Sequence, residues 1–308
     1  MYDVLVIGSL NMDYVVNIDS MPRLGETVSS CGFKMIPGGK GANQAYALSS
    51  LGVKTNMLGL VGNDENGKML ISNLKKARVN TKNIGRLKDV KTGCAFINVL
   101  NNGENSIVTV GGANKKVSKQ LIDNNIGLIK NSKIIIMQLE IPIQIVLYVA
   151  KIAKLLGKIV VIDPAPAVND IPEELYQYID ILKPNKTELA TITGIELKND
   201  DDVISAAKIL IQKGVKNVIV TLGEKGSILV NESGVNKFNA IKVNVIDTTA
   251  AGDAFLAGVV KSMLMNNSLE KAIQFGHIVS SIVITKEGAQ TSLPTEKELI
   301  EYMKRGNF

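Results

Sequence analysis

Residues 247–253, Asp-Thr-Thr-Ala-Ala-Gly-Asp, combine small side chains with an acid at a predicted helix start. The first N–H groups of a helix have no intrahelical partner, and the positive end of the helix dipole lies there. Ala250, Ala251 and Gly252 leave those N–H groups open to an anion such as phosphate. Asp253 could then take the proton of an attacking hydroxyl while the N–H groups hold the developing charge. The segment predicts a phosphoryl-transfer site, and an ordinary helix start with an acid in its first turn is the alternative.

A second segment with possible chemistry is Gly-Gly-Lys-Gly-Ala-Asn at 38–43. A Walker P-loop is excluded, because it requires glycine where Lys34 stands and serine or threonine where Gly41 stands. A dinucleotide fingerprint is excluded by Gln44, which occupies the place of its last glycine. What remains is a backbone that a small ligand can approach closely, with polar groups from Lys40 and Asn43. The segment favours a polyhydroxyl or anionic ligand, and a glycine-rich strand-to-helix turn is the alternative.

Polar residues also follow several predicted strands. Ligands of open α/β sheets bind beyond the carboxyl ends of the strands, so we expect these residues to share one crevice. Asn11 and Asp13 follow the first strand and could bind sugar hydroxyls, although an Asx turn would use the same residue types. The other strand ends carry Glu140, Asn185, Glu188, Thr221 and Gly223.

The composition of the 308-residue chain argues against a nucleic-acid partner. The net charge is +6, but the basic residues are spread along the chain, and the densest cluster is only Lys75, Lys76 and Arg78. Tryptophan is absent and aromatic residues make up 4% of the chain, which disfavours a surface for stacking bases. A modest positive field suits a small anionic ligand such as a nucleotide.

No segment indicates export or a membrane. The N-terminus lacks the basic and apolar regions of a signal peptide, and each apolar run is shorter than a membrane span. We therefore predict a cytoplasmic protein whose thiols, Cys31 and Cys94, stay reduced and serve as packing residues. With one histidine, His277, and no closely spaced cysteines, a structural zinc site is disfavoured.

The elements that must position these residues alternate between strands and helices. Apolar runs predict strands at 3–7, 53–61, 134–137, 159–162, 179–182 and 218–221. Helical patterns lie at 67–77, 142–156, 186–193, 203–213, 251–265, 269–285 and 296–304, and another follows the glycine-rich segment at 38–43. This alternation predicts an α/β fold with a central, mostly parallel sheet flanked by helices on both faces.

Two early β segments, near 14–36 and 92–110, do not fit this alternation. The second contains Asn-Asn-Gly at 101–103, which is a hairpin signal. We expect these segments to form a small β-sheet appended to the rest, as a lid or a dimer contact. No repeat, low-complexity tract or linker divides the chain, so residues 1–308 are predicted to form a single domain.

In combination, these segments resemble the ribokinase family of carbohydrate kinases, also called the PfkB group. The resemblance covers essentially the whole chain and rests on Gly-Gly-Lys-Gly-Ala-Asn-Gln-Ala at 38–45 and on residues 247–253. Asn11 and Asp13 before them, and Lys-Pro-Asn-Lys-Thr-Glu at 183–188 between them, make the combination specific. The departures from the family pattern, Glu224, Lys225 and Glu287, remove no catalytic group.

The resemblance implies a role for individual residues. Asp253 would be the catalytic base, and Ala250, Ala251 and Gly252 would form the anion hole. The sugar would be bound by Asn11, Asp13, Gly39, Lys40, Asn43 and Glu140, together with Asp253. ATP and its Mg²⁺ would lie near Asn185, Glu188, Thr221, Gly223, Gly226, Gly252 and His277. A monovalent cation, usually K⁺, would be held by Asp247, Thr249, Val283, Lys286, Gly288 and Ser292, several of them through backbone carbonyls.

The resemblance also implies an activity and an assembly. The activity would be the ATP-dependent phosphorylation of D-ribose at O5, with a small β-sheet lid over the sugar and a homodimer formed through paired lids. One alternative is a kinase of the same family that acts on another sugar or on a nucleoside. A further alternative is a sugar-binding regulator that has this fold but no catalysis.

Overall fold

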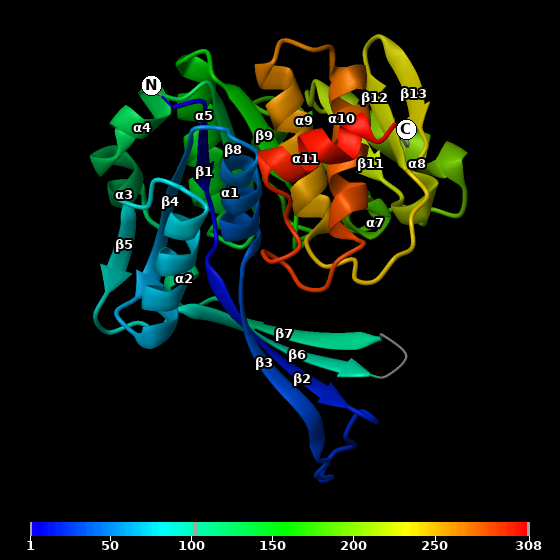
Figure 1. The fold of residues 1–308 in the computed structure, drawn as a ribbon. Helices are drawn as coiled ribbons and strands as arrows, with labels where there is room; N and C mark the ends of the chain where they lie inside the picture. Colours follow the sequence, from blue (N-terminus) through cyan, green and yellow to red (C-terminus); the bar gives the residue numbers. More distant parts are fainter. Residues whose placement is uncertain (1, 101–103, 307–308) are drawn as a thin grey trace.

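The computed structural model describes residues 2–100 and 104–306, and the Asn-Asn-Gly hairpin signal at 101–103 lies outside the described residues. The described strands form a nine-stranded sheet and a separate four-stranded sheet (Figure 1). The larger sheet has the order β13-β12-β11-β10-β9-β8-β1-β4-β5. Neighbouring strands from β5 to β11 run parallel, and β12 and β13 pair antiparallel at one edge.

The strands of the larger sheet lie close to their predicted positions. They are β1 (Val4–Ile7), β4 (Thr55–Gly62), β5 (Ile84–Leu87), β8 (Ile134–Gln138), β9 (Ile159–Asp163), β10 (Ile181–Leu182), β11 (Asn217–Thr221), β12 (Ser227–Asn231) and β13 (Gly234–Phe238). Every residue of β1, β4 and β8 is buried, as expected for parallel strands covered on both faces. The strand expected at 179–182 is shorter than predicted, because only its last residue pair joins the sheet as β10.

Alternate residues of each central strand enter different hydrophobic cores. Val4 and Val6 of β1 belong to one core, and Leu5 and Ile7 belong to the other. The first core is covered by α1 (Lys40–Ser50), α2 (Glu65–Lys76), α9 (Ala251–Leu264), α10 (Leu269–Val283) and α11 (Glu296–Lys304). The second core is covered by α3 (Lys119–Asn124), α4 (Ile126–Lys130), α5 (Ile143–Leu155), α6 (Glu173–Tyr176), α7 (Lys186–Thr193) and α8 (Asp200–Gln212). The predicted three-layer arrangement is therefore confirmed.

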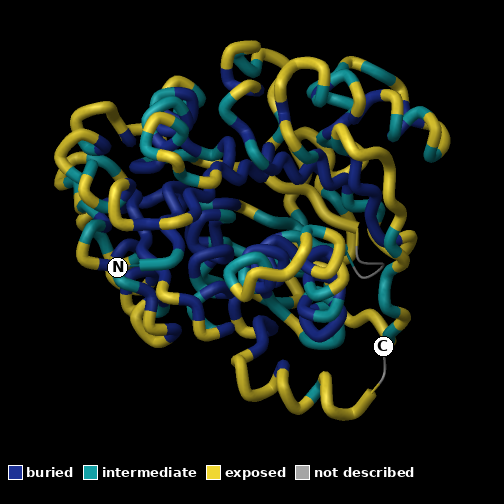
Figure 2. Tube along the Cα trace, turned by 90° about the horizontal axis from the view of Figure 1, so that it is seen from above, coloured by how far each residue is buried: buried dark blue, intermediate teal, exposed yellow. Residues whose placement is uncertain are grey.

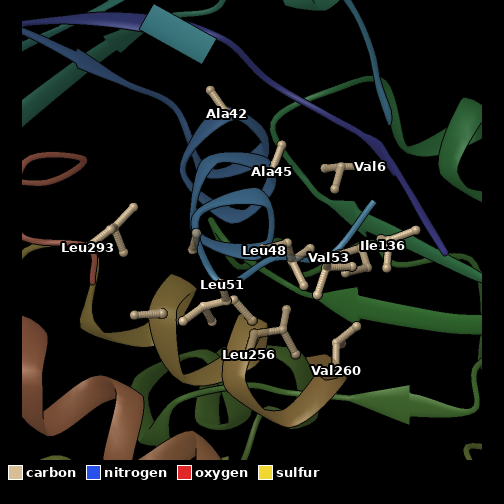
Figure 3. Packing of buried hydrophobic residues seen from close by; sticks show 14 of the residues in the cluster. Val6, Ala42, Ala45, Leu48, Leu51, Val53, Ile136, Leu256, Val260 and Leu293 are labelled. Atoms are coloured by element: carbon tan, nitrogen blue, oxygen red, sulfur yellow. The ribbon is translucent and has the colours of Figure 1, made fainter. Parts of the chain in front are cut away.

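Helices α1 and α9, which begin at the two segments singled out in the sequence, pack directly on each other. Leu48 of α1 and Leu51, which follows it, lie beside Leu256 and Val260 of α9, near Ile136 of the sheet (Figure 3). Viewed from above, buried segments gather in the middle of the molecule and exposed segments lie around it (Figure 2). The site residues at the starts of α1 and α9 are thus held by a continuous apolar core.

The smaller sheet extends away from this body (Figure 1). It consists of β2 (Asn11–Ile18), β3 (Ser30–Gly38), β6 (Gly93–Leu100) and β7 (Asn105–Val110), in the order β3-β2-β6-β7. Strands β2 and β3 pair antiparallel, as do β6 and β7, whereas β2 and β6 are parallel. Asn11 and Asp13 therefore lie in a strand rather than in the Asx turn that was the alternative.

The two cysteines differ in their surroundings. Cys94 packs against the first core, as predicted, but Cys31 is exposed on β3 and its Sγ donates to Asp19. The prediction of a packing role was wrong for Cys31, because the strand that carries it has no layer over it. Among the described residues, no helix combines the length and the apolar character that crossing a membrane requires.

Helices α9 and α10 approach so closely that Gly258 cannot carry a side chain without displacement. A Cβ at Gly258 would lie 2.9 Å from Gly276 Cα and 2.9 Å from Val279 Cγ2. We expect Gly258→Ala to lower the free energy of unfolding by about 1–2 kcal/mol, because overpacking outweighs the gain in helix propensity. The measurement is urea denaturation followed by circular dichroism.

The matched control is Gly127→Ala in α4, where a Cβ would meet nothing within 4 Å. This change should be neutral or stabilising by up to about 1 kcal/mol. Equal effects of the two substitutions would contradict the packing argument.

Candidate active site

The start of α9 exposes backbone N–H groups as the sequence predicts. Ala250 precedes the helix with φ of +61°, and no side chain caps the first turn. Ala251 N–H donates to Thr248 O, and the first helical bond runs from Ala254 N–H to Ala250 O. The N–H groups of Gly252 and Asp253 lie between these two bonds, in the first turn, where a helix binds anions. A Cβ at Gly252 would lie 3.3 Å from Lys183 Nζ, so a larger residue would crowd this space.

Asp253 follows these groups and is 5% exposed. Asn43 Nδ2 donates to Asp253 Oδ2 at 3.1 Å, and Gln44 Nε2 donates to Asp253 Oδ1 at 2.9 Å. Burial raises the pKa of Asp253, while the charges of Lys40 and Lys183 and the Gln44 hydrogen bond oppose the rise. A carboxylate with a raised pKa and both oxygens held in place is suited to accepting a proton near neutral pH.

A second buried carboxylate, Asp163 at the end of β9, lies beside Asp253. Gln44 Nε2 donates to both carboxylates, at 2.8 Å to Asp163 Oδ2 and at 2.9 Å to Asp253. Asp163 also pairs with Lys183 Nζ at 3.1 Å and with Lys40 Nζ at 3.7 Å. Burial would raise the pKa of Asp163, but the two lysine charges outweigh it and hold this pKa below its usual range. Asp163, Asp253 and Lys183, all buried, and the partly exposed Lys40 therefore form one cluster with balanced charge.

A polar group next to this cluster contains the residues predicted to bind sugar. Glu140 accepts from Asn11 Nδ2 at 3.4 Å, from Lys40 N–H at 3.1 Å, and from Ser9 Oγ. Burial, with the charges of Glu140 and Asp253, raises the pKa of Asp13 to about 7. Asn11, Asp13, Lys40 and Glu140 therefore lie together, close enough to Asp253 for its charge to act on Asp13.

The glycine segment lets α1 approach this group. Gly39 has φ of +87°, and a Cβ there would lie 2.6 Å from Asn11 N. A Cβ at Gly41 would lie 2.6 Å from Ser9 N. Only glycine combines this backbone conformation with this close contact, which explains the run that the sequence analysis singled out.

The residues predicted to bind nucleotide line one cavity of about 360 Å³. Asn185 and Glu188 form a capping box at the start of α7, in which each side chain accepts from the other's backbone N–H at 2.8 Å. Burial, followed by the charge of Asp163, raises the pKa of Glu188. The lining residues are Lys40, Lys183, Asn185, Glu188, Thr221, Gly223, Gly226, Thr248, Ala250, Ala251, Gly252, Asp253, Phe255, His277 and Ser280.

His277 forms part of the wall between this cavity and a larger one. The second cavity, of about 890 Å³, is bordered by His277, Gly223 and the segment from Ala240 to Lys242. His277 Nε2 lies 2.8 Å from Ser227 Oγ, and its ring packs 5.0 Å from the Phe255 ring. Burial lowers the pKa of His277 to about 4, so the ring is neutral at physiological pH. This agrees with a pocket wall rather than a charged catalytic group.

The residues predicted to hold a monovalent cation lie in two segments that hydrogen-bond to each other. Asp247 Oδ2 accepts from Gly288 N–H at 2.8 Å, and Asp247 Oδ1 accepts from Thr249 N–H at 2.8 Å. Ser292 Oγ donates to Ala289 O within the same loop. The Lys286 side chain points to Glu298 instead, so this residue could contribute only backbone atoms. Val283 O accepts from Lys286 N–H at the end of α10.

Comparison with known proteins identifies the family. Residues 1–296 match the model of the pfkB family of carbohydrate kinases. The chain belongs to the PfkB family. It is 38% identical to a ribokinase of Haemophilus influenzae over 300 residues, which covers 97% of each chain. It is 34% identical to a deoxyribokinase of Salmonella typhi, which covers 98% of each. The structure of Arabidopsis thaliana ribokinase complexed with ribose and ATP superposes with a TM-score of 0.92 at 34% identity, covering 98% of this chain and 99% of that one.

Membership of the PfkB family confirms the predicted fold class and the prediction of a carbohydrate kinase. Sequence reasoning missed three residues of the site: Asp163, Lys183 and Gln44. No role is predicted from the sequence for Asp163 or Lys183, and Gln44 serves only to exclude a dinucleotide fingerprint and as part of the motif at 38–45. The rule of polar residues at strand ends would have found Asp163, which ends β9, and Lys183, which follows β10. No local signal distinguishes Gln44.

Substitutions in the Asp163–Lys183 pair test how far the stability of the protein depends on charge balance in this cluster. Lys183→Met should lower the free energy of unfolding by about 3–5 kcal/mol, because it leaves Asp163 buried with less compensation. Lys183→Met combined with Asp163→Asn should cost less than the two single changes added together, since neither charge is then left alone. Urea denaturation of the single and double variants measures this coupling.

Lys198→Met is the control, because the Lys198–Glu196 pair is exposed, with side chains 70% and 80% accessible. It should change stability by less than about 1 kcal/mol. Strict additivity of Lys183→Met and Asp163→Asn would show that the buried pair is not coupled.

Proposed function

We propose that the protein is an ATP-dependent ribokinase that transfers the γ-phosphoryl group of ATP to O5 of D-ribose. The observation that carries the proposal is the place of Asp253. It lies beside the open N–H groups of α9, between the polar group around Asp13 and the cavity lined by Asn185, Glu188 and Thr221. The relatives support the choice of substrate, since the Arabidopsis ribokinase structure holds ribose and ATP.

In the proposed reaction, the sugar hydroxyl gives its proton to Asp253 as its oxygen attacks the γ-phosphorus. A new P–O bond forms to the sugar, and the bond between the γ-phosphorus and the oxygen that bridges to the β-phosphate breaks. ADP leaves with the electron pair of that bond. The N–H groups of Gly252 and Asp253 hold charge on the transferring phosphoryl oxygens, and Lys183 adds a positive charge beside them.

The proposed sugar site consists of Asn11, Asp13, Gly39, Lys40, Asn43 and Glu140, with Asp253. The carboxylates and amides of this set offer both donors and acceptors, which is what sugar hydroxyls require. Asn43 already donates to Asp253, so its remaining amide hydrogen is the one that can reach a ligand. The proposed nucleotide site is the cavity lined by Asn185, Glu188, Thr221, Gly223, Gly226, Gly252 and His277.

The residues around the phosphate end of that cavity fit Mg²⁺. Magnesium is commonly held by one or two carboxylates plus substrate phosphates, so a site for it need not contain many protein ligands. Among the described residues, no group of three or more His, Cys, Asp or Glu side chains could hold a metal ion alone. Glu188, with Asn185, would be the carboxylate side of such a site. When bound, Mg²⁺ would neutralise charge on the phosphates.

The two segments around Asp247 and Gly288 fit a monovalent cation. Hydrogen bonds from Thr249 and Gly288 outweigh burial and hold the pKa of Asp247 below its usual range, so its carboxylate is ionised. Asp247, Thr249, Ser292 and the carbonyls of Val283, Lys286 and Gly288 supply oxygen atoms, which hard cations such as K⁺ prefer. The cation would add positive potential next to the start of α9.

We further propose a single kinase domain over 1–308, with the β segments near 14–36 and 92–110 as the lid. One face of the small sheet carries exposed apolar side chains, and Tyr14 stacks between Phe33 and Phe96 there. Pairing of two lids through this face would bury the exposed set of Phe33, Met35, Phe96, Val108 and Val110. This supports a homodimer. We retain the predictions of cytoplasmic location and of small-molecule rather than nucleic-acid partners.

The substrate can be tested directly by ADP release. The assay uses ATP and Mg²⁺ with ribose, deoxyribose, fructose, adenosine or no sugar, in K⁺ or Na⁺. We expect the highest kcat/KM with ribose and a higher rate in K⁺. Preference for deoxyribose would keep the mechanism and replace the substrate, and the Salmonella typhi relative is named a deoxyribokinase. Absence of ADP release with every sugar would favour a non-catalytic regulator.

Asp253→Asn tests the catalytic base. This variant should keep ribose binding within about threefold but lose about 10²–10⁴-fold in kcat, because the amide cannot accept the proton. Isothermal titration calorimetry measures binding, and the coupled assay measures turnover. Glu301→Gln on the exposed face of α11 is the control and should match the wild type. Near-normal turnover by Asp253→Asn would eliminate Asp253 as the base.

The raised pKa of Asp13 predicts that sugar binding depends on pH. Its pKa of about 7 means that the ionised fraction rises between pH 6 and 8. An ionised carboxylate accepts stronger hydrogen bonds from hydroxyls, so ribose affinity should rise with pH across this range and fall below pH 7. Calorimetric titrations from pH 5.5 to 8.5 measure the dependence. Asp13→Asn should bind more weakly and with no step near pH 7, and a step that survives this change would assign it to another group.

A further inference from the structure

Gln290 lies in the loop between α10 and α11 but directs its side chain into the protein interior. It is 3% exposed. Its Nε2 donates to Asn43 Oδ1 at 2.9 Å, and its Oε1 accepts from Asn73 Nδ2 of α2. Both ends of the carboxamide are therefore engaged, by residues of two different helices. A buried amide with both ends bonded is fixed in orientation.

The hydrogen-bond chain continues from Gln290 to Asp253. Asn43 accepts from Gln290 through Oδ1 and donates to Asp253 Oδ2 through Nδ2 at 3.1 Å. An ionised carboxylate can only accept, so Asn43 must present its nitrogen to Asp253 and its oxygen to the other side. That oxygen needs a donor, which Gln290 supplies. If Asn43 were reversed, its oxygen would face the carboxylate and the two acceptors would repel each other.

The Gln290–Asn43 hydrogen bond also connects Asp253 to the loop in which Gln290 lies. Gln290 lies between Gly288, whose N–H donates to Asp247, and Ser292, whose hydroxyl bonds to Ala289 O. The loop that would hold the monovalent cation therefore reaches the base through two buried side chains, Gln290 and Asn43. The neighbouring hydroxyl, Thr291 Oγ1, instead donates to Glu287 O within the loop.

We propose that Gln290 is a positioning residue for Asp253: it sets the orientation of the Asn43 carboxamide and links the loop at 286–292 to the base. The proposal rests on the proposed function only in taking Asp253 as the base. Gln290 is not part of the proposed sugar site and does not line the proposed nucleotide cavity, so it acts through Asn43. Its effect should therefore appear in the properties of Asp253 and, through Asn43, in sugar binding, but not in the binding of ATP.

The charged groups that face Asp253 come from several elements. They are Lys40 of α1, Lys183 after β10, Asp163 of β9 and Asp13 of β2. None of them is bonded to Gln290, so its replacement leaves their charges unchanged. Loss of a correctly oriented Asn43 donor removes a hydrogen bond to the ionised form of Asp253, which raises its pKa. The acid limb of a kcat–pH profile should then move to higher pH.

The decisive variant is Gln290→Glu, which keeps the shape of the side chain and replaces the donor with an acceptor. We expect kcat at pH 7 to fall by about 10–100-fold, as for other residues that orient a catalytic group. KM for ATP should stay within about twofold, KM for the sugar should rise because Asn43 also belongs to the proposed sugar site, and the acid limb should move up. Gln290→Ala should act in the same direction. Asn73→Ala should act more weakly, because it only releases the far end of the Gln290 amide.

Thr291→Ala is the matched control, because Thr291 is exposed, is the next residue in the loop and has no bond to the chain of amides. It should match the wild type in kcat, KM and pH profile. Melting temperatures of all variants identify any general loss of structure. If Gln290→Ala does not fold, Gln290→Glu and Asn73→Ala still carry the test.

The same property can be read without turnover, by ¹³C NMR titration of the Asp253 carboxyl group. The Asp253 signal is assigned by its loss in Asp253→Asn. A higher Asp253 pKa in Gln290→Ala, which adds no charge, than in the wild type is the expected result, even if no sugar is phosphorylated. An unchanged Asp253 pKa in Gln290→Ala and in Asn73→Ala overturns the positioning role. Failure of the wild type to release ADP would instead remove the proposed function.

Discussion

The catalytic end of the molecule depends on burying two carboxylates beside each other. Asp163 and Asp253 share the Gln44 amide, and their charge is balanced by Lys40 and Lys183. Burying either acid alone would cost several kcal/mol, so the acids and lysines have to be assembled together. They come from β9, α9, α1 and the end of β10, which means that the strand order of the sheet is what brings the charges into contact.

The same assembly joins the proposed sugar and nucleotide sides of the site. Lys40 follows directly on Gly39, where strand β3 of the small sheet leads into α1. Its backbone N–H holds Glu140 on the sugar side, and its ammonium group faces Asp163 on the nucleotide side. Any movement of the small sheet about this junction therefore acts on a residue that belongs to both halves. The close contact of Gly39 with Asn11 restricts how such a movement can occur.

The sequence predicts the parts of the structure that local patterns determine. Apolar runs and glycine spacing locate β1, β8 and the starts of α1 and α9, and the rule of polar strand ends correctly gathers Glu140, Asn185 and Thr221 into one region. The sequence could not predict that Gln44 bridges two acids or that Gln290 donates to Asn43. Those contacts join residues more than 100 positions apart. A glutamine in a helix or loop has no periodicity that reveals its partner. Cys31 shows the converse limit, since a strand pattern does not say whether a layer covers it.

The start of α9 lacks a capping side chain, which lowers the stability of this helix at the proposed active site. Several helices away from the site begin with capping side chains, such as Asp64 for α2, Ser268 for α10 and Thr295 for α11, although α4, α5 and α6 do not. Ala250 provides no such cap, and its left-handed conformation costs about 1–2 kcal/mol for a residue with a Cβ. A serine or aspartate there would gain about 1 kcal/mol by bonding the first N–H groups. It would also occupy the N–H groups that would bind a phosphoryl oxygen in the proposed reaction. The missing cap therefore follows from the same requirement as the buried acids: charge must be held by the protein before the ligand arrives.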